Sequence, residues 1–179
     1  MRDGFVTESK TMGKVRAALH NGVRDCRELA LAGRLSCNWP TKRHFYSASS
    51  STVVALTSYP KRIVHAWRSV ETILRQDTHV GPVVLVLAEE DFPRREIPVR
   101  LRRQTTRGLE ILWVKRNGFS FDKLLPVRRE FTDLPVITVD DDLYFPSNLV
   151  GDLVAAAESH PGAIVGSRGW RVIPSPQDG

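Results

Sequence analysis

The segment PVITVDDDLYFPSN, from Pro135 to Asn148, joins an apolar run rich in β-branched residues to three consecutive aspartates, Asp140, Asp141 and Asp142. β-Branched residues favour strands, and side chains alternate along an extended segment. The pattern predicts a strand over 135–139 whose acidic end turns Asp140 and Asp142 one way and Asp141 the other. Like charges this close repel one another unless a cation relieves them.

Apolar runs alternate with amphipathic stretches along the rest of the domain. The expected strands cover 53–57, 83–88, 109–114, 135–139 and 163–166, and the expected helices cover 62–76, about 99–103, 121–131 and 146–160. Pro126 is expected to disturb the third of these helices. Continuously apolar strands that alternate with helices predict an α/β fold with a mostly parallel sheet, flanked by helices on both faces.

The carboxyl ends of parallel strands meet at one edge of the sheet, and ligands of open α/β sheets bind there. The candidate ligand-binding residues are therefore the polar residues that follow each strand, at 57–60, 89–91, 115–117, 140–142 and 167–168.

A divalent ion is one way to relieve the repulsion among the aspartates. Mg²⁺ and Mn²⁺ take one or two carboxylates and fill their remaining positions with water and phosphate oxygens. We favour a metal site at Asp140 and Asp142 over the alternative, a solvated acidic turn, because Tyr144 and Phe145 follow directly. The sequence lacks the spacing of an EF-hand, the glycines of a dinucleotide-binding turn and a P-loop.

The basic character of the chain lies in its first residues. Residues 1–52 hold nine Lys/Arg against four Asp/Glu, whereas residues 53–179 hold seventeen against sixteen. A near-neutral domain argues against a nucleic-acid partner for the whole chain. DNA binding by the basic arm stays as a weaker alternative.

We divide the chain into an N-terminal arm over 1–51 and a domain over 52–179. Apolar residues at helical spacing between Val15 and Ala30 predict one helix in the arm, with Gly33 at its C-terminal cap. We favour packing on the domain or on a partner as its role, over contact with an anionic membrane surface. A serine-rich linker over 36–51 follows.

The composition is that of a soluble globular protein, with 41% apolar and 26% charged residues in a chain of 179. Cys26 and Cys37 are too few and too far apart for a CxxC motif, and we interpret them as thiols of a reducing compartment. No apolar run would span a bilayer, and the N-terminus lacks the apolar core of a secretory signal. These features predict a cytoplasmic protein.

Five segments taken in order resemble the GT-A fold nucleotide-sugar glycosyltransferases, close to the family 2-like group. They are VVALTSYPKRI, AWRSVETILRQ, VVLVLAEEDFP, FDKLLPV and VITVDDDLYFP, and the resemblance covers roughly Thr52 to Val172. It implies a Rossmann-like GT-A domain that binds a nucleoside diphosphate sugar.

The resemblance also implies roles for the aspartates. Asp140 and Asp142 match the two acids of the DxD motif, which hold Mn²⁺ or Mg²⁺ and through it the diphosphate. Asp141, between them, is expected to approach the ribose or the sugar.

The nucleotide is expected to meet the turn after the first strand. Thr57, Tyr59 and Pro60 match the nucleotide-proximal turn, Arg62 is placed to reach a phosphate or the base, and Lys123 matches a lysine near the nucleotide. A solvated helix start for Arg62 and an exposed helical lysine for Lys123 stay as alternatives.

The reaction implied is transfer of a sugar from a nucleoside diphosphate to a hydroxyl acceptor, either a glycan or a lipid-linked sugar at the inner face of the membrane. The general base is not identified. The sequence stops at Gly179, where such enzymes continue into an acceptor-binding half. The alternative is therefore a non-catalytic nucleotide-binding or interaction module.

Overall fold

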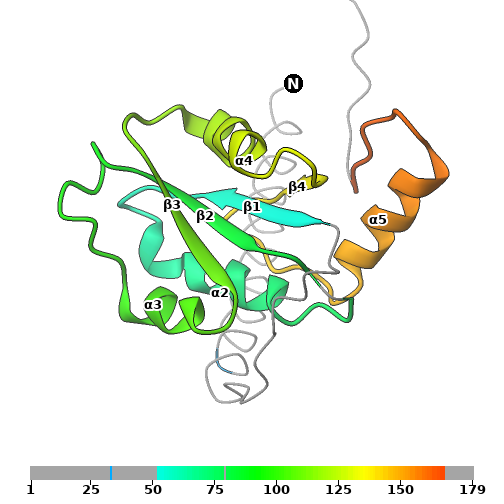
Figure 1. Ribbon diagram of the computed structural model, residues 1–179. Helices are drawn as coiled ribbons and strands as arrows, with labels where there is room; N and C mark the ends of the chain where they lie inside the picture. The colour runs from blue at the N-terminus through cyan, green and yellow to red at the C-terminus, as the bar shows by residue number, and fades with distance from the viewer. Residues whose placement is uncertain (1–32, 34–51, 79, 168–179) are drawn as a thin grey trace, which may run out of the picture. The chain divides into compact units, whose positions relative to one another are not determined.

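The computed structural model describes residues 33, 52–78 and 80–167 (Figure 1). The strands are β1 (Val53–Thr57), β2 (Val83–Ala88), β3 (Leu109–Val114) and β4 (Val136–Thr138). The helices are α2 (Ile63–Ile73), α3 (Val99–Thr105), the 3₁₀ helix η1 (Phe119–Lys123), α4 (Leu125–Glu130) and α5 (Leu149–Ser159).

The four strands form one parallel sheet in the order β3-β2-β1-β4. Leu56 of β1 pairs with Leu85 of β2, and Val54 of β1 pairs with Ile137 of β4. Because both pairs are parallel, the chain must cross over the sheet between the paired strands. This confirms the predicted α/β fold with a parallel sheet flanked by helices. It also brings the carboxyl ends of β1 and β4 together at one edge, which we call the C-terminal edge.

The core lies on both faces of the two central strands. Every residue of β2 and four of the five in β1 are buried, whereas β3 and β4 are partly exposed, as edge strands are. Val127 of α4 packs with Val53 and Val86 on one face of the sheet. In Figure 1, α4 lies on one side of the sheet, and α2 and α3 lie on the other.

Helix α2 presents the predicted apolar face to the sheet. Ile63, Ala66, Val70 and Ile73 are buried at three- and four-residue steps, and Trp67 is 4% exposed. Trp67 is therefore a core residue, and the guanidinium of Arg100 covers its ring at 4.2 Å from the centroid.

Two expected helices differ at their starts. The helix expected over 121–131 is split into η1 and α4, with Pro126 in the first turn of α4, where its missing N–H costs nothing. The helix expected from Pro146 begins three residues later, at Leu149, after a turn in which the Leu149 N–H contacts the Pro146 carbonyl at 3.2 Å.

The strand predicted over 163–166 is wrong. These residues form no strand, and Ile164 is fully exposed. A strand needs a neighbour that supplies ladder hydrogen bonds. In the described part of the chain no strand pairs with this run, not even the edge strand β4, so its local apolar pattern does not suffice to make it a strand.

Most of the prediction for the N-terminal arm lies outside the described residues, including both cysteines and the linker. Gly33 itself is helical, so the prediction that it caps the C-terminal end of a helix is wrong. Arg168 and Arg171 also lie outside the described residues. No helix in the described ranges is long and apolar enough to cross a membrane.

Candidate functional site

Asp141 is the buried centre of the C-terminal edge. Its side chain is 7% exposed and lies just after β4. The Ser58 hydroxyl, just after β1, donates to Asp141 Oδ2 at 2.5 Å, and Arg62 Nη2 lies 2.7 Å from Asp141 Oδ1. Both carboxylate oxygens therefore have partners from the turn that leads into α2.

Arg62 links two of the aspartates. Its Nη2 atom also lies 2.5 Å from Asp142 Oδ2, and its guanidinium stands 5.8 Å from the centroid of the Tyr59 ring. Burial alone would lower the pKa of Arg62, but the charges of Asp141 and Asp142 outweigh it and raise the pKa above its ordinary value. Arg62 is thus a permanent cation here, and the solvated helix start is wrong.

Lys123 neutralises the third aspartate. Its Nζ, at the end of η1, lies 2.6 Å from Asp140 Oδ1. The lysine side chain is 20% exposed, so the alternative of a freely exposed helical lysine does not hold. Asp140 and Asp142 are 59% and 56% exposed. The predicted alternation in direction is not what the contacts show, because Asp141 and Asp142 both meet Arg62 Nη2 while Asp140 meets Lys123. The three acids lie in the turn beyond β4, where the strand's alternation no longer holds.

The repulsion among the aspartates is relieved by side chains of the protein. The sequence pattern favoured a captured divalent ion, whereas the structure places Arg62 and Lys123 against the acids. Among the described residues, no group of three or more His, Cys, Asp or Glu side chains could enclose a metal.

The C-terminal edge nevertheless fits a divalent ion that takes most of its ligands from water and phosphate. Asp140 Oδ2 and Asp142 Oδ1 have no protein partner among the described side chains, and both residues are more than half exposed. Mg²⁺ commonly binds one or two carboxylates and completes its shell with water and phosphate. Asp140 and Asp142 could hold such an ion, in competition with Lys123 and Arg62.

The turn after β1 contributes the remaining predicted residues. The Tyr59 carbonyl accepts the N–H groups of Arg62 and Ile63 at 2.9 and 3.0 Å, which starts α2 and aims Arg62 at the acids. The Tyr59 ring is 42% exposed beside Arg62, and Pro60 is exposed too. Thr57 is turned the other way, because its hydroxyl donates to the Val86 carbonyl at 3.0 Å.

Three polar side chains in α2 and just after it hold the segment that follows the aspartates. Ser69 Oγ donates to the Leu143 carbonyl at 2.8 Å, and Thr72 Oγ1 accepts the Phe145 N–H at 3.2 Å. Gln76 Nε2 donates to the Pro146 carbonyl at 2.7 Å, and its Oε1 accepts the Val150 N–H at 2.9 Å.

The sequence pattern did not point to these three residues, and Ser58 lay within the candidate range 57–60 without a role of its own. Their signal was polar side chains spaced three and four apart within an apolar helix, inside the quoted segment AWRSVETILRQ.

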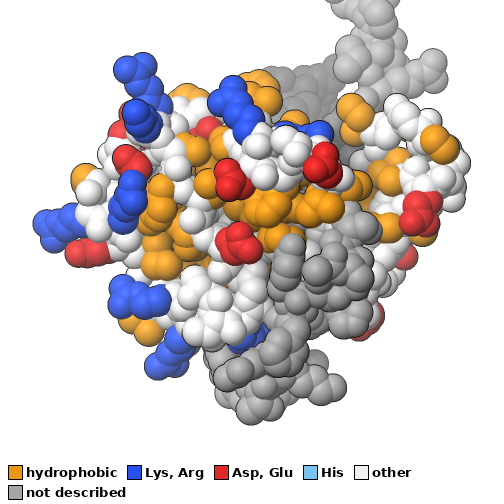
Figure 2. All heavy atoms as spheres, viewed as in Figure 1, with side chains coloured by type: hydrophobic (Ala, Val, Ile, Leu, Met, Phe, Trp, Pro, Cys, Tyr) orange, Lys and Arg blue, Asp and Glu red, His pale blue; other side chains and the backbone are white. Residues whose placement is uncertain are grey.

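The acids after β2 serve a different loop. Asn117, after β3, donates its N–H to Glu90 Oε1 at 2.5 Å and its Nδ2 to Asp91 Oδ2 at 2.7 Å. Glu89 pairs with Arg95. These residues lie at the same edge but make no described contact with the three aspartates. Figure 2 shows acidic and basic side chains interspersed on the side where β2 and β3 end.

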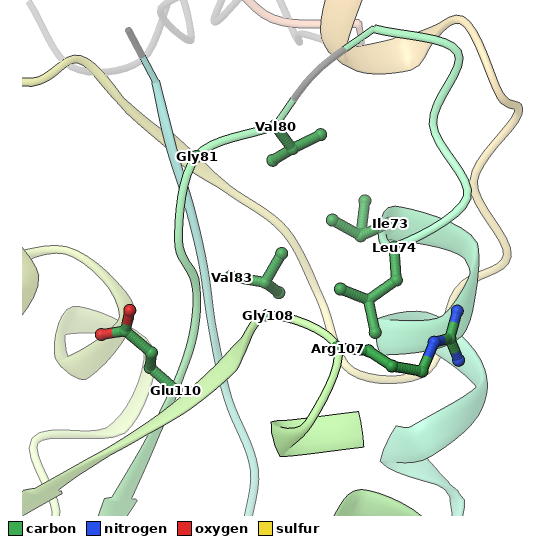
Figure 3. Close-up of a pocket in the computed structure, with 8 residues that line it drawn as sticks. All are labelled: Ile73, Leu74, Val80, Gly81, Val83, Arg107, Gly108 and Glu110. Carbon is green, nitrogen blue, oxygen red and sulfur yellow. The ribbon is translucent and has the colours of Figure 1, made fainter. Parts of the chain in front are cut away.

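A small cavity lies at the opposite end of the strands (Figure 3). It measures about 30 Å³ and is lined by residues at the start of β2 and β3 and in helix α2, namely Ile73, Leu74, Val80, Gly81, Val83, Arg107, Gly108 and Glu110. The charged ends of Arg107 and Glu110 point away from each other in Figure 3. This volume accommodates about one water molecule, so it is no substrate site.

Comparison with known proteins gives a distant structural likeness. No protein family and no curated protein matches the sequence. The structure matches that of S. aureus TarS, residues 1–349, a GT-A glycosyltransferase. The TM-score is 0.43 at 17% identity, over 70% of this chain. This chain spans 38% of that length of TarS. A likeness this distant transfers no activity from one protein to the other.

Proposed function

We propose that this chain binds the donor of a metal-dependent glycosyltransferase, which moves a sugar from a nucleoside diphosphate to a hydroxyl of a glycan or lipid-linked acceptor. The observation that carries the proposal is the meeting of Arg62, Lys123 and three aspartates at the carboxyl edge of a parallel sheet. Open α/β sheets bind their ligands at this edge.

The charges of the edge suit a diphosphate. Arg62 and Lys123 supply two cations, and a guanidinium can donate two parallel hydrogen bonds to phosphate oxygens. Asp140 and Asp142 would hold Mn²⁺ or Mg²⁺ through their exposed oxygens. Such an ion, when bound, supplies Lewis-acid stabilisation of the departing diphosphate.

The remaining residues orient these groups. Asp141 has both oxygens engaged by Ser58 and Arg62, so in this proposal it positions Arg62 and does not contact the ribose. The exposed ring of Tyr59, with Pro60 beside it, offers an apolar surface for the nucleoside. Thr57 fixes the turn through β2.

The alternative is a nucleotide-binding module without transfer. One observation favours it: both oxygens of Asp141 are engaged, and the proposal assigns Asp140 and Asp142 to the ion, so none of the three aspartates is left as the base for an acceptor hydroxyl. Both functions share donor binding. Release of nucleoside diphosphate from a donor sugar in the presence of acceptor separates them, because a module binds the donor and releases nothing.

Titration calorimetry with UDP and GDP, in Mn²⁺ and in EDTA, tests donor binding. We expect binding that requires Mn²⁺ and is lost in Asp142→Ala. Asp133→Ala is the matched control, because Asp133 is an exposed acid in the turn before β4 and away from the edge. Equal heats with Mn²⁺ and with EDTA would refute the metal role, and no binding under either condition would refute donor binding.

A further inference from the structure

The segment 115–129, KRNGFSFDKLLPVRR, exposes apolar side chains beyond the end of β3. Phe119 is 77% exposed, Phe121 70% and Leu125 51%. Four of the nine exposed large hydrophobic side chains in the described part of the chain lie between 119 and 125, so they form a patch and not a scatter. Concentrated apolar exposure of this kind marks an interaction surface.

The backbone holds these rings outside the core. Phe119 has a φ of 55°, which is uncommon for a residue with a side chain and costs energy. Its N–H donates to Asn117 Oδ1 at 2.7 Å, and the Gly118 N–H donates to Asp122 Oδ2 at 2.8 Å. A Cβ on Gly118 would lie 2.5 Å from Asp122 Oδ1, so a larger residue fits only if the Asp122 carboxylate moves.

The hydrogen bonds within this loop are tied to the fold. Asp122 is buried, and Asn117 is anchored on Asp91 at the end of β2. The fold therefore maintains a strained conformation whose result is the exposure of Phe119. Exposure of the rings follows from this arrangement and not from a lack of structure.

The segment itself is basic, with five Lys/Arg against one acid, Asp122. Lys115, Arg116, Arg128 and Arg129 are exposed, and the guanidinium of Arg128 donates to the Leu134 carbonyl at 2.7 Å. Exposed acids also adjoin the segment: Glu90 at Asn117, Asp140 at Lys123, and Glu130 directly after it. In Figure 1 the segment runs along one rim of the molecule from β3 to α4, and Figure 2 shows Lys and Arg side chains projecting from that side.

We propose that segment 115–129 docks peripherally on an anionic lipid bilayer. The phenylalanine rings would enter the headgroup region while the flanking cations meet anionic headgroups, which is the composition of interfacial anchors. The excess of basic over acidic residues within the segment favours this occupant over a second copy of the chain, whose segment would carry the same excess. The inference does not depend on the proposed function. Because Lys123 of this segment contacts Asp140, docking would place the candidate site at the bilayer surface.

Co-sedimentation of the whole protein with lipid vesicles tests the proposal. Vesicles of phosphatidylcholine are compared with vesicles in which about one third of the lipid is phosphatidylglycerol. We expect binding to the anionic vesicles only, and roughly tenfold weaker binding by Phe119→Ser/Phe121→Ser and by Arg116→Gln/Arg129→Gln. Val64→Ser/Val99→Ser is the matched control, because both valines are more than half exposed elsewhere, and it should bind as the wild type does.

The other results overturn the proposal. Binding unchanged in the phenylalanine variant would assign lipid contact to another part of the chain. Equal binding to neutral vesicles would exclude recognition of anionic lipid. A wild type that dimerises without lipid through these phenylalanines, and shows no vesicle binding, would assign the patch to a second copy.

Phe119→Trp gives a second measurement that does not depend on a disruptive change. Its added fluorescence should shift to shorter wavelength on anionic vesicles, relative to the wild type measured in parallel. An unshifted spectrum would contradict insertion of this residue.

Discussion

Replacing Glu71 by alanine should remove a large part of the stability of the domain. Glu71 is fully buried on α2, with Arg107 Nη1 at 2.6 Å and Arg75 Nε at 2.7 Å from its carboxylate oxygens. Gln104 Nε2 donates to it at 2.9 Å. The carboxylate therefore joins α2 to residues at the end of α3 and just beyond it.

The expected cost follows from the burial of the partners. Arg107 is 5% exposed, and loss of one member of a buried ion pair costs about 3–5 kcal/mol. Folded domains have free energies of unfolding of about 5–15 kcal/mol. Glu71→Ala should therefore lower the free energy of unfolding by about a fifth or more.

The matched control is Arg75→Ala. Arg75 is 28% exposed and pairs with Glu71 across one helical turn. Such partly exposed pairs contribute about 0.3–0.5 kcal/mol. Urea unfolding followed by Trp67 fluorescence and circular dichroism measures both variants. If the free energy of unfolding of Glu71→Ala lies within about 1 kcal/mol of the wild-type value, roughly the level of the control, the role assigned to this buried pair is refuted.

Two further predictions concern Glu110, at the start of the edge strand β3, and Gln76, which holds the loop after the aspartates. Partial desolvation of its carboxyl, and then the charge of Glu130, raise the pKa of Glu110 above its ordinary value, although the residue is exposed at the surface. A raised carboxyl pKa in the folded state costs stability as pH rises through it, so Glu110→Gln should be more stable than the wild type at pH 7. The free energies of unfolding of the two proteins should converge below the unfolded-state pKa of about 4.3. A difference between them in urea unfolding that stays the same across this pH range would contradict the raised pKa of Glu110. Gln76→Leu removes the partners of the Pro146 carbonyl and the Val150 N–H and should cost about 1–3 kcal/mol. It should also weaken any Mn²⁺-dependent nucleotide binding, whereas Thr78→Ala, an exposed change two residues on, should leave both properties unchanged.

The sequence alone determined the fold class and most of its elements. The strands 53–57, 83–88 and 109–114 are confirmed at both ends, and the amphipathic stretch over 62–76 forms helix α2 with its apolar face buried. These predictions succeeded because apolar periodicity is a local property that burial enforces at each position. The run 163–166 carried the same local signal and failed, because a strand also needs a neighbour that its own residues do not specify.

Only the tertiary structure decided what neutralises the aspartates. The acids were visible in the sequence, but Ser58 and Asp141 lie 83 positions apart, and Lys123 and Asp140 lie 17 apart. These pairs meet because β4 lies beside β1 in the sheet, and because η1 places Lys123 against the end of β4. Strand order is a long-range result of packing, so the composition of the edge could be predicted from the sequence while its ion pairs could not.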